Sequence, residues 1–571
     1  MFKQSNNTLT MTGFGGIGAK IGGGQISDVV NFRIRSDGAL EKRCGYRCFS
    51  DAGQEIRAFY SGLFAGNFRM LLLAGDTVYE ASLTSDTLTP LCTVGSDQGA
   101  ACFFYLDGTL YLMDGQELFV IRDGEAVPAA GYAPLLGKDW PCTVEGEIYE
   151  PRNLLTRHAR ISYVVGTPAS AMLCTKYAVE SVEAVYLNGV RLDTDQYRID
   201  SLLNTVNVPG LVEGDRVLIY LTFTEDMAEM RNAFLSCTDS VLFGGVRGNR
   251  LCFCGGSMTS TMFCSAEVDE DSVRECARHY SDEGMLYLPE GYEFTVGDGR
   301  HCICGTVPHH DSLLIFTEGD AWMAKNDVSG VERFPIVGVH SQLGCASAGG
   351  AVAVENRVFT VGRHGILQWE DTAGLSEGCQ VRSVSDPVQR FFEGTLSSDW
   401  GLFYQEAEHL LLCYHRKSGN VLLCQIDREE WFRYTGIIAD EFFDADGNIG
   451  FRHEEKLFVL DPALAEDVSP EGEQLTISAE YTAERVDFGD ERRKLLAGIS
   501  LCGDFDGGIG EWVLGEDGRR VSTHFLRCDE PSSYGIVQQR TPSGRFRYLS
   551  FRLRSKEAYR PVFHRLSLHL R

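Results

Sequence analysis

The sequence predicts an all-β fold, and three observations support that prediction. The chain of 571 residues is 44% hydrophobic and 11% aromatic, which allows large buried cores. It contains 62 Gly against only 16 Pro, a balance typical of many short strands joined by tight turns. Its apolar residues fall in short runs bounded by turn dipeptides, and the only helix of note is a short one expected near residues 226–234.

The clearest strand pattern lies between Cys102 and Gly124. Apolar runs at 102–106, 109–113 and 118–122 are separated or followed by Asp107-Gly108, Asp114-Gly115 and Asp123-Gly124. Asp-Gly between apolar runs is a strong hairpin signal, because glycine accepts the positive φ that such turns require. This stretch is therefore predicted to be an antiparallel meander.

The same pattern recurs at 69–83, 313–324, 357–369, 410–434 and 457–460. Meanders of three or four strands that repeat every 40–50 residues or so are typical of propeller blades. The repeat lies in the pattern and not in the letters, and a double β-sandwich would also give such meanders. The predicted fold class is a β-propeller with an inserted β-sandwich domain and a C-terminal β-sandwich domain.

Two stretches interrupt the rhythm and set the predicted domains. Residues 141–226 are predicted to form the inserted sandwich, and residues 469–571 the C-terminal sandwich, where Leu566, Leu568 and Leu570 share one strand face. Residues 51–140 and 227–468 form the discontinuous propeller, after an N-terminal arm and first strand at 1–50. The glycine-rich part of that arm, 13–24, lacks the strand and helix that a phosphate-binding loop needs, and we expect it to stay flexible until it packs on a partner.

The net charge of −28 argues against a sequence-specific reader of DNA or RNA, although it does not exclude DNA passing by. No N-terminal signal peptide and no run of about 20 apolar residues is present, so synthesis in a cytoplasm and no membrane span are expected. The 19 cysteines are interpreted mainly as reduced core residues. A metal remains the alternative for the closely spaced pairs Cys252/Cys254 and Cys302/Cys304.

Signals of catalysis are poor. The chain has no Walker A sequence, no Gly-x-Ser-x-Gly elbow, no His-Glu-x-x-His motif and no sialidase-type repeat. His309-His310 would point to opposite faces of a strand, which disfavours a shared metal. The calcium-like Asp444-x-Asp446-Gly447 run is interpreted as a hairpin turn. We therefore expect no catalytic, cofactor-binding or metal-binding residues, no cofactor, and a protein that is not an enzyme.

Residues 28–47 read Asp-Val-Val-Asn-Phe-Arg-Ile-Arg-Ser-Asp-Gly-Ala-Leu-Glu-Lys-Arg-Cys-Gly-Tyr-Arg. This stretch resembles the N-terminal signature of tailed-bacteriophage neck and tail-hub β-propeller proteins of the stabilisation or tail-nozzle type, with Cys44 where that pattern usually has Pro. Further stretches resemble later blades and the closing sandwich of the same family, in the family's order: 249–256, 262–265, 311–316, 343–347 and 486–489.

The resemblance implies a structural component of a tailed-phage virion, in a homo-oligomeric ring of the neck or tail through which DNA passes. Its implied partners are a portal or adaptor protein or other tail proteins, and its place is the virion after synthesis in the host bacterial cytoplasm. Acidic residues would let DNA slide, and basic strands would dock on acidic neighbours. The candidate assembly-interface residues are Arg33, Arg35, Lys42, Arg43, Tyr46, Arg545, Arg547, Arg552 and Arg554.

Other interpretations remain open at this point. The basic C-terminal strands would also fit an ordinary solvated strand face. The chain would also fit a carbohydrate-binding or carbohydrate-active propeller, such as a receptor-binding tail protein, or a bacterial scaffold propeller unrelated to phage. The carbohydrate alternative predicts an aromatic-lined pocket with paired carboxylates, and measurable glycan binding.

Overall fold

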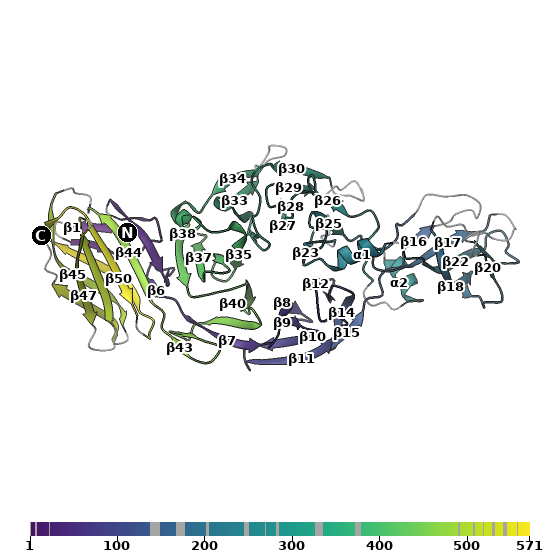
Figure 1. Cartoon of the computed structure of the whole chain (residues 1–571), viewed down its shortest axis with the longest axis horizontal. Helices are drawn as coiled ribbons and strands as arrows, with labels where there is room; N and C mark the ends of the chain where they lie inside the picture. The colour runs from purple at the N-terminus through teal and green to yellow at the C-terminus, as the bar shows by residue number, and fades with distance from the viewer. Residues whose placement is uncertain are drawn as a thin grey trace. The chain divides into compact units, whose positions relative to one another are not determined.

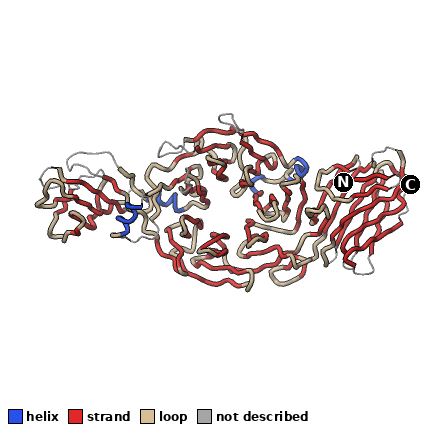
Figure 2. The backbone as a smooth tube through the Cα atoms, turned by 180° about the vertical axis from the view of Figure 1, so that it is seen from behind, coloured by secondary structure: helices blue, strands red, loops and turns tan. Residues whose placement is uncertain are grey.

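The structure is a computed structural model in which strands far outnumber helices (Figure 2). It describes residues 2–5, 8–21, 23–137, 149–166, 177–200, 205–225, 227–244, 250–268, 270–280, 285–325, 335–371, 379–488, 492–505, 509–517, 519–527, 532–540, 545–556 and 558–571. The predicted all-β class is confirmed.

The chain divides into two compact units. The first unit comprises Met1–Glu55, Ala81–Leu88 and Gln342–Arg571, and the second comprises Ile56–Glu80 and Thr89–Ser341. The stretch predicted as one discontinuous propeller contributes sheets to both units, and the predicted insert lies wholly in the second. The predicted domain bounds themselves stay predictions.

In the part of the chain that the structure describes, the second unit holds four-stranded antiparallel sheets in the up-and-down order of propeller blades. The tip of one hairpin, Ala81–Leu88, belongs to the first unit. The strands of these sheets are β8 (Ile56–Phe64), β9 (Asn67–Ala74), β10 (Thr77–Ser82) and β11 (Thr87–Thr93); β12 (Cys102–Leu106), β13 (Thr109–Met113), β14 (Leu118–Arg122) and β15 (Glu125–Pro128); β23 (Asp239–Leu242), β24 (Leu251–Cys254), β25 (Thr261–Cys264) and β26 (Phe294–Thr295); β27 (Ile303–His309), β28 (Ser312–Thr317), β29 (Ala321–Lys325) and β30 (Ile336–His340).

The meander predicted from Cys102 onward is confirmed. Asp107 and Gly108 have φ angles of 48° and 82°, and Asp123 and Gly124 have 50° and 83°. Positive φ at both central residues defines the type I′ turn, whose twist matches that of the flanking strands. The two turns therefore close the β12–β13 and β14–β15 hairpins at the same end of one sheet.

The inserted domain is a five-stranded sheet of order β16-β17-β22-β18-β19, accompanied by the β20–β21 hairpin. One face of the sheet and the hairpin share a core that includes Ile161, Val185, Val206 and Ile219. The strands are β16 (Leu135–Gly137), β17 (His158–Val164), β18 (Val179–Leu187), β19 (Val190–Arg191), β20 (Arg198–Asp200), β21 (Thr205–Asn207) and β22 (Arg216–Phe223).

Two α-helices follow the insert among the described residues, α1 (Ala228–Leu235) and α2 (Glu270–Ala277). The short helix predicted near 226–234 is confirmed as α1, with Asp226 outside the described residues. Helix α2 packs on the insert sheet through Arg160 and Tyr220, which bond to Glu275. Figure 1 shows α2 beside the strands of the insert.

The first unit contains further blade-like sheets in its described residues. One of them is completed by the N-terminal strand β7, which pairs with β41 and so closes a sheet whose other strands lie some 400 residues later. These strands are β31 (Ala351–Val354), β32 (Arg357–Gly362), β33 (Gly365–Asp371) and β34 (Cys379–Ser383); β35 (Trp400–Gln405), β36 (Leu410–His415), β37 (Asn420–Gln425) and β38 (Glu430–Thr435); β39 (Glu441–Ala445), β40 (Asn448–His453), β41 (Lys456–Asp461) and β7 (Gly45–Asp51), with 3₁₀ turns at Asp386–Phe391 and Ser397–Asp399.

The rest of the first unit is the C-terminal sandwich, in which N-terminal and C-terminal strands pair. One sheet runs β1-β2-β51-β45-β48, with β5, β6 and β49 attached, and the other continues from β38 through β4-β44-β50-β46-β47, with β3 attached. Their bounds are β1 (Phe2–Ser5), β2 (Thr8–Met11), β3 (Lys20–Ile21), β4 (Gly24–Val30), β5 (Phe32–Ile34), β6 (Leu40–Lys42), β44 (Ala479–Val486), β45 (Lys494–Phe505), β46 (Ile509–Glu516), β47 (Arg519–Arg527), β48 (Ser532–Arg540), β49 (Arg545–Phe546), β50 (Leu549–Ser555) and β51 (Val562–Leu570), and a separate hairpin joins β42 (Asp467–Val468) to β43 (Gln474–Leu475).

The expectation that residues 13–24 need a partner in order to pack is wrong, because Phe14, Ile17 and Ile21 are buried in the core of the chain's own first unit. Leu9 and Met11 lie directly opposite Leu568 and Leu566, and all four side chains are buried. Farther along the arm, Phe14 packs edge-on against Tyr481 with ring centroids 5.3 Å apart. The arm is ordered because its alternating apolar residues complete the core of the chain's own C-terminal sandwich, which places both termini in this sandwich (Figure 1).

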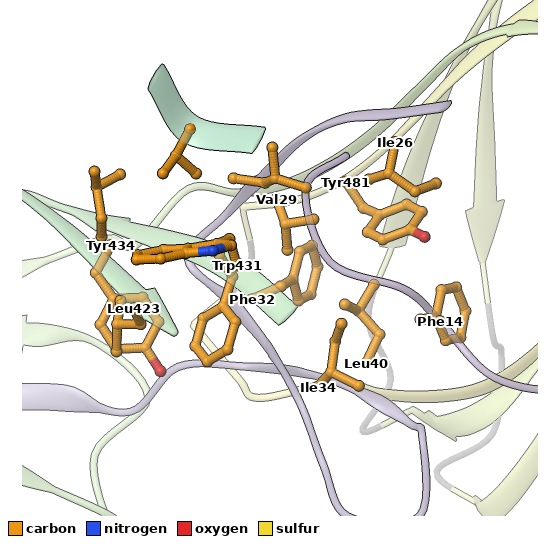
Figure 3. Packing of buried hydrophobic residues seen from close by; sticks show 14 of the residues in the cluster. Phe14, Ile26, Val29, Phe32, Ile34, Leu40, Leu423, Trp431, Tyr434 and Tyr481 are labelled. Carbon is orange, nitrogen blue, oxygen red and sulfur yellow. The ribbon is translucent and has the colours of Figure 1, made fainter. Parts of the chain in front are cut away.

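A single apolar core runs from the sandwich into the neighbouring blade-like sheet of the first unit. Figure 3 shows Phe32 and Val29 of the N-terminal segment packed beside Trp431 and Tyr434 of β38. The ring nitrogen of Trp431 donates a hydrogen bond to the Val384 carbonyl oxygen, so the large indole is buried without an unsatisfied polar group.

Beside this core lies a buried polar junction centred on Arg43, whose side chain is 1% exposed. Its guanidinium makes two 2.7 Å bonds to the Asp467 carboxylate, and its remaining N–H groups donate to Asn31 Oδ1, the Cys44 carbonyl and the Thr435 carbonyl. All five guanidinium donors are thus satisfied. The junction ties the N-terminal segment to the ends of β38 and to β42.

We expect Asp467→Ala to destabilise the first unit by about 3–5 kcal/mol, because it leaves the Arg43 charge buried without its partner. Chemical denaturation followed by tryptophan fluorescence would measure the loss, since Trp431 lies in the adjoining core. Arg35→Ala is the matched control, because the Arg35–Asp37 pair is 43% and 47% exposed, and it should change the unfolding free energy by about 1 kcal/mol or less. Equal effects of the two changes would contradict this account of the junction.

Candidate functional site

The structure places part of the predicted assembly interface inside the molecule. Lys42 and Arg43 are 0% and 1% exposed, and Tyr46 packs edge-on against Phe451 and Phe458. Lys42 and Arg43 are therefore not surface charges for docking, which corrects that part of the prediction. Lys42 is the last residue of β6, and Arg43, which follows it, is buried with its guanidinium bonded to Asp467.

Arg33 and Arg35 lie nearer the surface, yet both are engaged within the chain. Arg33 Nε bonds to Glu41 at 2.8 Å, and its Nη1 bonds to Glu408 at 3.0 Å. Arg35 forms a looser pair with Asp37 at 3.7 Å. Any acidic partner would have to compete with these carboxylates.

The C-terminal arginines alternate with buried residues along β50. Arg552 and Arg554 both bond to Glu480 on the neighbouring strand β44, at 2.8 and 2.7 Å, while Phe551 and Leu553 face the core. Of the predicted set, Arg35, Arg545 and Arg547 are exposed.

The other sequence motifs are local structure. Asp446 and Gly447 form the positive-φ turn of the β39–β40 hairpin, as predicted. His309 and His310 were predicted to point to opposite faces of a strand. Instead, His310 lies at a turn with a φ of 52°, and the centroids of the two rings are 4.4 Å apart. In the described ranges no group of three or more His, Cys, Asp or Glu side chains is arranged to hold a metal ion.

A pocket of about 800 Å³ in the second unit combines aromatic, acidic and basic side chains. Its lining includes the aromatic residues Phe64, Tyr111 and Tyr287, of which the two tyrosines are only 7% and 5% exposed, the acidic residues Glu80, Asp107, Asp123 and Glu267, and the basic residues Arg69 and Arg122. The volume falls within the range typical of small-molecule sites. We call this feature the blade pocket.

The predicted meander itself builds one side of the blade pocket. Its two Asp-Gly turns carry Asp107 and Asp123, and because two strand spacings separate these turns, their backbones lie about 10 Å apart. Burial, together with the charge of Asp107, raises the pKa of Tyr111 to about 12, so this phenol is protonated at neutral pH. The pocket edge thus presents two ionisable carboxyls near a neutral hydroxyl.

The remaining walls come from distant segments. Arg69 and Glu80, on β9 and β10, form an ion pair at 3.4 Å, and the Arg69 guanidinium lies 5.5 Å from the Phe64 ring centroid. Segments 265–268 and 285–287 are held together by a hydrogen bond from the Ala266 N–H to the Tyr287 carbonyl. Sequence reasoning missed this pocket, because these residues share no motif and meet only in the folded unit.

A second cluster missed by the sequence analysis centres on Glu183 in the inserted domain. The pairing of β18 with β22 is irregular between Val182 and Ala184, and the residue at this bulge is Glu183. Its carboxylate accepts hydrogen bonds from the Thr222 and Tyr280 hydroxyls and contacts His158 Nδ1 at 2.6 Å. His279, whose ring stacks on Tyr220 at 4.2 Å, approaches it at 3.5 Å.

Burial by itself would raise the pKa of Glu183, but the hydrogen bonds from His158, Thr222 and Tyr280 outweigh burial and lower that pKa to about 2. Burial also lowers the pKa of His279, which favours its neutral form. The carboxylate is therefore charged throughout the neutral range and fastens the segment after α2 to the insert sheet. Because the Glu183 carboxylate already has several hydrogen-bond partners within the chain, a structural role is favoured over a role in ligand binding.

Comparison with known proteins gives no family assignment. No family model and no curated protein matches the chain. Matching solved structures include an exo-β-1,3-galactanase from Phanerochaete chrysosporium, seen with galactose and with β-1,3-galactotriose, at 8% identity over 93% of this chain and 100% of that one, with a TM-score of 0.22. Another is the extracellular domain of a protein described as a one-component system from B. thetaiotaomicron, at 8% identity over 96% and 84%, with a TM-score of 0.20.

The prediction that the chain is not an enzyme is contradicted by these matches, because two of them are to a glycoside hydrolase, and it is withdrawn. At TM-scores of 0.22 and below, the likeness assigns neither substrate nor reaction to this chain. In the residues that the structure describes, no helix is both long and apolar enough to cross a membrane.

We expect Glu183→Gln to lower the stability of the second unit at neutral pH by at most about 3 kcal/mol. Because the folded pKa of about 2 lies below the usual 4.5, the stabilisation is complete above pH 4.5 and is lost as the pH falls toward 2. Denaturant titrations of both proteins from pH 7 to pH 3 would test this.

The matched control is Glu180→Gln, on the same strand, whose pair with Arg157 is half exposed. Glu180→Gln should change the unfolding free energy of the second unit by no more than about 1 kcal/mol, and this change should vary little with pH. If the difference between wild type and Glu183→Gln stayed constant down to pH 3, the assigned direction of the Glu183 pKa shift would be wrong.

Proposed function

We propose that the second unit binds a saccharide in the blade pocket. The observation that carries the proposal is a cavity of about 800 Å³ whose lining combines four acidic residues with the partly exposed aromatic residue Phe64. Sugar rings offer apolar C–H faces that pack on aromatic side chains, and hydroxyl groups that donate to carboxylates.

The net charge of the blade pocket indicates which kind of saccharide it would bind. Four carboxylates line it against two guanidinium groups, and the Arg69 guanidinium is already paired with Glu80. A carboxylated or sulfated sugar would meet net negative charge, whereas a neutral or amino sugar would not. The proposed ligand is therefore a neutral or amino-sugar oligosaccharide.

The turns that carry Asp107 and Asp123 allow a matched test. Asp107→Asn and Asp123→Asn keep a residue that tolerates positive φ, but they remove the charged acceptors, so the affinity for the saccharide should fall about tenfold or more. Glycan-array screening of the whole chain would identify ligands, and calorimetry would measure the affinities. The products should also be analysed for cleavage, which would show whether binding leads to hydrolysis.

Asp446→Asn is the control, because Asp446 occupies the same kind of positive-φ turn and is not one of the residues that line the blade pocket. It should leave the affinity unchanged. The proposal fails if the wild type binds no neutral or amino sugar, if only anionic glycans bind, or if all three variants behave alike.

A second candidate function is the virion component implied by the sequence resemblance. The specific observation in its favour is that residues of the resembling stretch meet at one place. Asn31, Arg43 and Tyr46 all bond at the junction with Asp467. A β-carbon at Gly45 would lie 1.8 Å from the Glu466 carbonyl oxygen, so this position requires glycine. The motif therefore acts as one structural unit.

For this candidate, mass spectrometry of purified virions should find the protein at a fixed copy number, in a ring on the tail axis by cryo-electron microscopy. Charge reversal at the exposed pair, Arg545→Glu with Arg547→Glu, should then reduce its incorporation into particles. Asp446→Asn again serves as a control that should assemble normally. Absence of the protein from virions would exclude this candidate without affecting the saccharide proposal.

A further inference from the structure

Two buried thiols face each other in the second unit. Cys252 lies on β24 and Cys264 on β25, and their sulfur atoms are 2.9 Å apart. Their exposed fractions are 0% and 4%, and Met262 and Ile303 belong to the apolar cluster around them. The distance is shorter than an ordinary contact between two apolar sulfur atoms, so the pair is more than two neighbouring core residues.

The strand register accounts for this approach. Cys252 and Cys264 are directly opposite each other in the antiparallel β24–β25 pair. The adjacent pair is hydrogen-bonded, since the Ser265 N–H donates to the Leu251 carbonyl. Because the two kinds of pair alternate, Cys252 and Cys264 occupy a non-hydrogen-bonded position, where α-carbons lie about 4.5 Å apart and side chains come closest. That separation falls within the range that a disulfide spans.

Other core cysteines show that proximity of strands alone does not produce this geometry. Cys413 and Cys424 also lie on paired strands, β36 and β37, and both are buried. Their direct partners are Leu422 and Leu411, so the two cysteines are diagonal neighbours. Cys254, two residues from Cys252, is equally buried and lies opposite Asp239 of β23.

We propose that Cys252 and Cys264 are a modification site, at which a small peroxide oxidant converts the two thiols into an intramolecular disulfide. Cys264, the less buried of the two, attacks hydrogen peroxide, forming a sulfenic acid and releasing one water. The Cys252 sulfur then attacks the sulfenic sulfur, the S–S bond forms and a second water leaves. Two thiols and one peroxide thus yield one disulfide and two waters.

The buried position of Cys252 and Cys264 determines which oxidant can reach the thiols and which two strands the disulfide would link. Nearly complete burial excludes a bulky oxidant such as glutathione disulfide from the folded protein, whereas peroxide is small enough to enter during local opening. In a reducing cytoplasm the thiols persist, and in oxidising surroundings the bond links β24 to β25 covalently. The closed loop is short, and the bond should raise the melting temperature of the unit that contains it.

The test treats the folded full-length protein with hydrogen peroxide, blocks the remaining thiols with iodoacetamide in denaturant, and digests it without reductant. Chymotrypsin cuts after Phe253 and Phe263, which places Cys252, Cys254 and Cys264 on separate peptides. The expected result is a reducible link between the Cys252 and Cys264 peptides, with Cys254 blocked. A melting transition several degrees higher than in the reduced protein should accompany the link.

Cys254→Ala is the matched control, because it removes a buried thiol from the same strand and should keep both the link and the thermal shift. Cys252→Ala and Cys264→Ala should each lose both. The wild-type peptide map decides the question even if a variant fails to fold. Recovery of Cys252 fully blocked after peroxide treatment, its linkage to Cys254, or conversion of Cys264 to a sulfinic acid in place of a disulfide would overturn the proposal.

Discussion

The buried ion pair between Arg43 and Asp467 is the constraint on which the first unit depends. A guanidinium without solvent is tolerated only where every donor has a partner, and here those partners come from segments hundreds of residues apart. Asn31 adopts a φ of 52° and bonds to both Arg43 and Thr435, so the bend between β4 and β5 is fixed by the same network. The N-terminal segment thus pairs with strands of the sandwich, through β4–β44 and β6–β51, and with β38 of the neighbouring blade-like sheet.

Local features of the fold were predictable from the sequence, whereas long-range ones were not. The turns at Asp107-Gly108 and Asp123-Gly124 were predicted correctly, because the dipeptide itself sets the backbone conformation. The pairing of Leu9 with Leu568 joins the two ends of the chain, and no local pattern specifies such a partner. Arg43 was predicted to lie at an assembly interface, but its guanidinium is buried against Asp467, a partner more than 400 residues away that no local pattern specifies.

The candidate sites illustrate the same limit. Asp107 and Asp123 were visible as turn residues, but their role in a pocket emerges only when Phe64, Arg69 and Tyr287 are brought beside them. No residue pattern marks the Glu183 cluster either, because a bulge in β18 decides where that carboxylate lies. Sites assembled from several elements leave little trace in a single sequence, unlike hairpins, whose signal is contained in adjacent residues.

The ion pairs that arginines of this acidic chain form within the fold limit where a partner could bind. Three arginines, Arg33, Arg552 and Arg554, form ion pairs with carboxylates of their own unit. These pairs largely neutralise their charges. Since an exposed pair contributes little to stability, such contacts could still be exchanged for a partner's carboxylates at small cost. The buried pair at Arg43 could not, because separating it would leave a charge without solvent or partner. Interactions with other molecules are therefore expected at the exposed arginines and at the blade pocket, while the signature-like N-terminal residues maintain the fold that presents them.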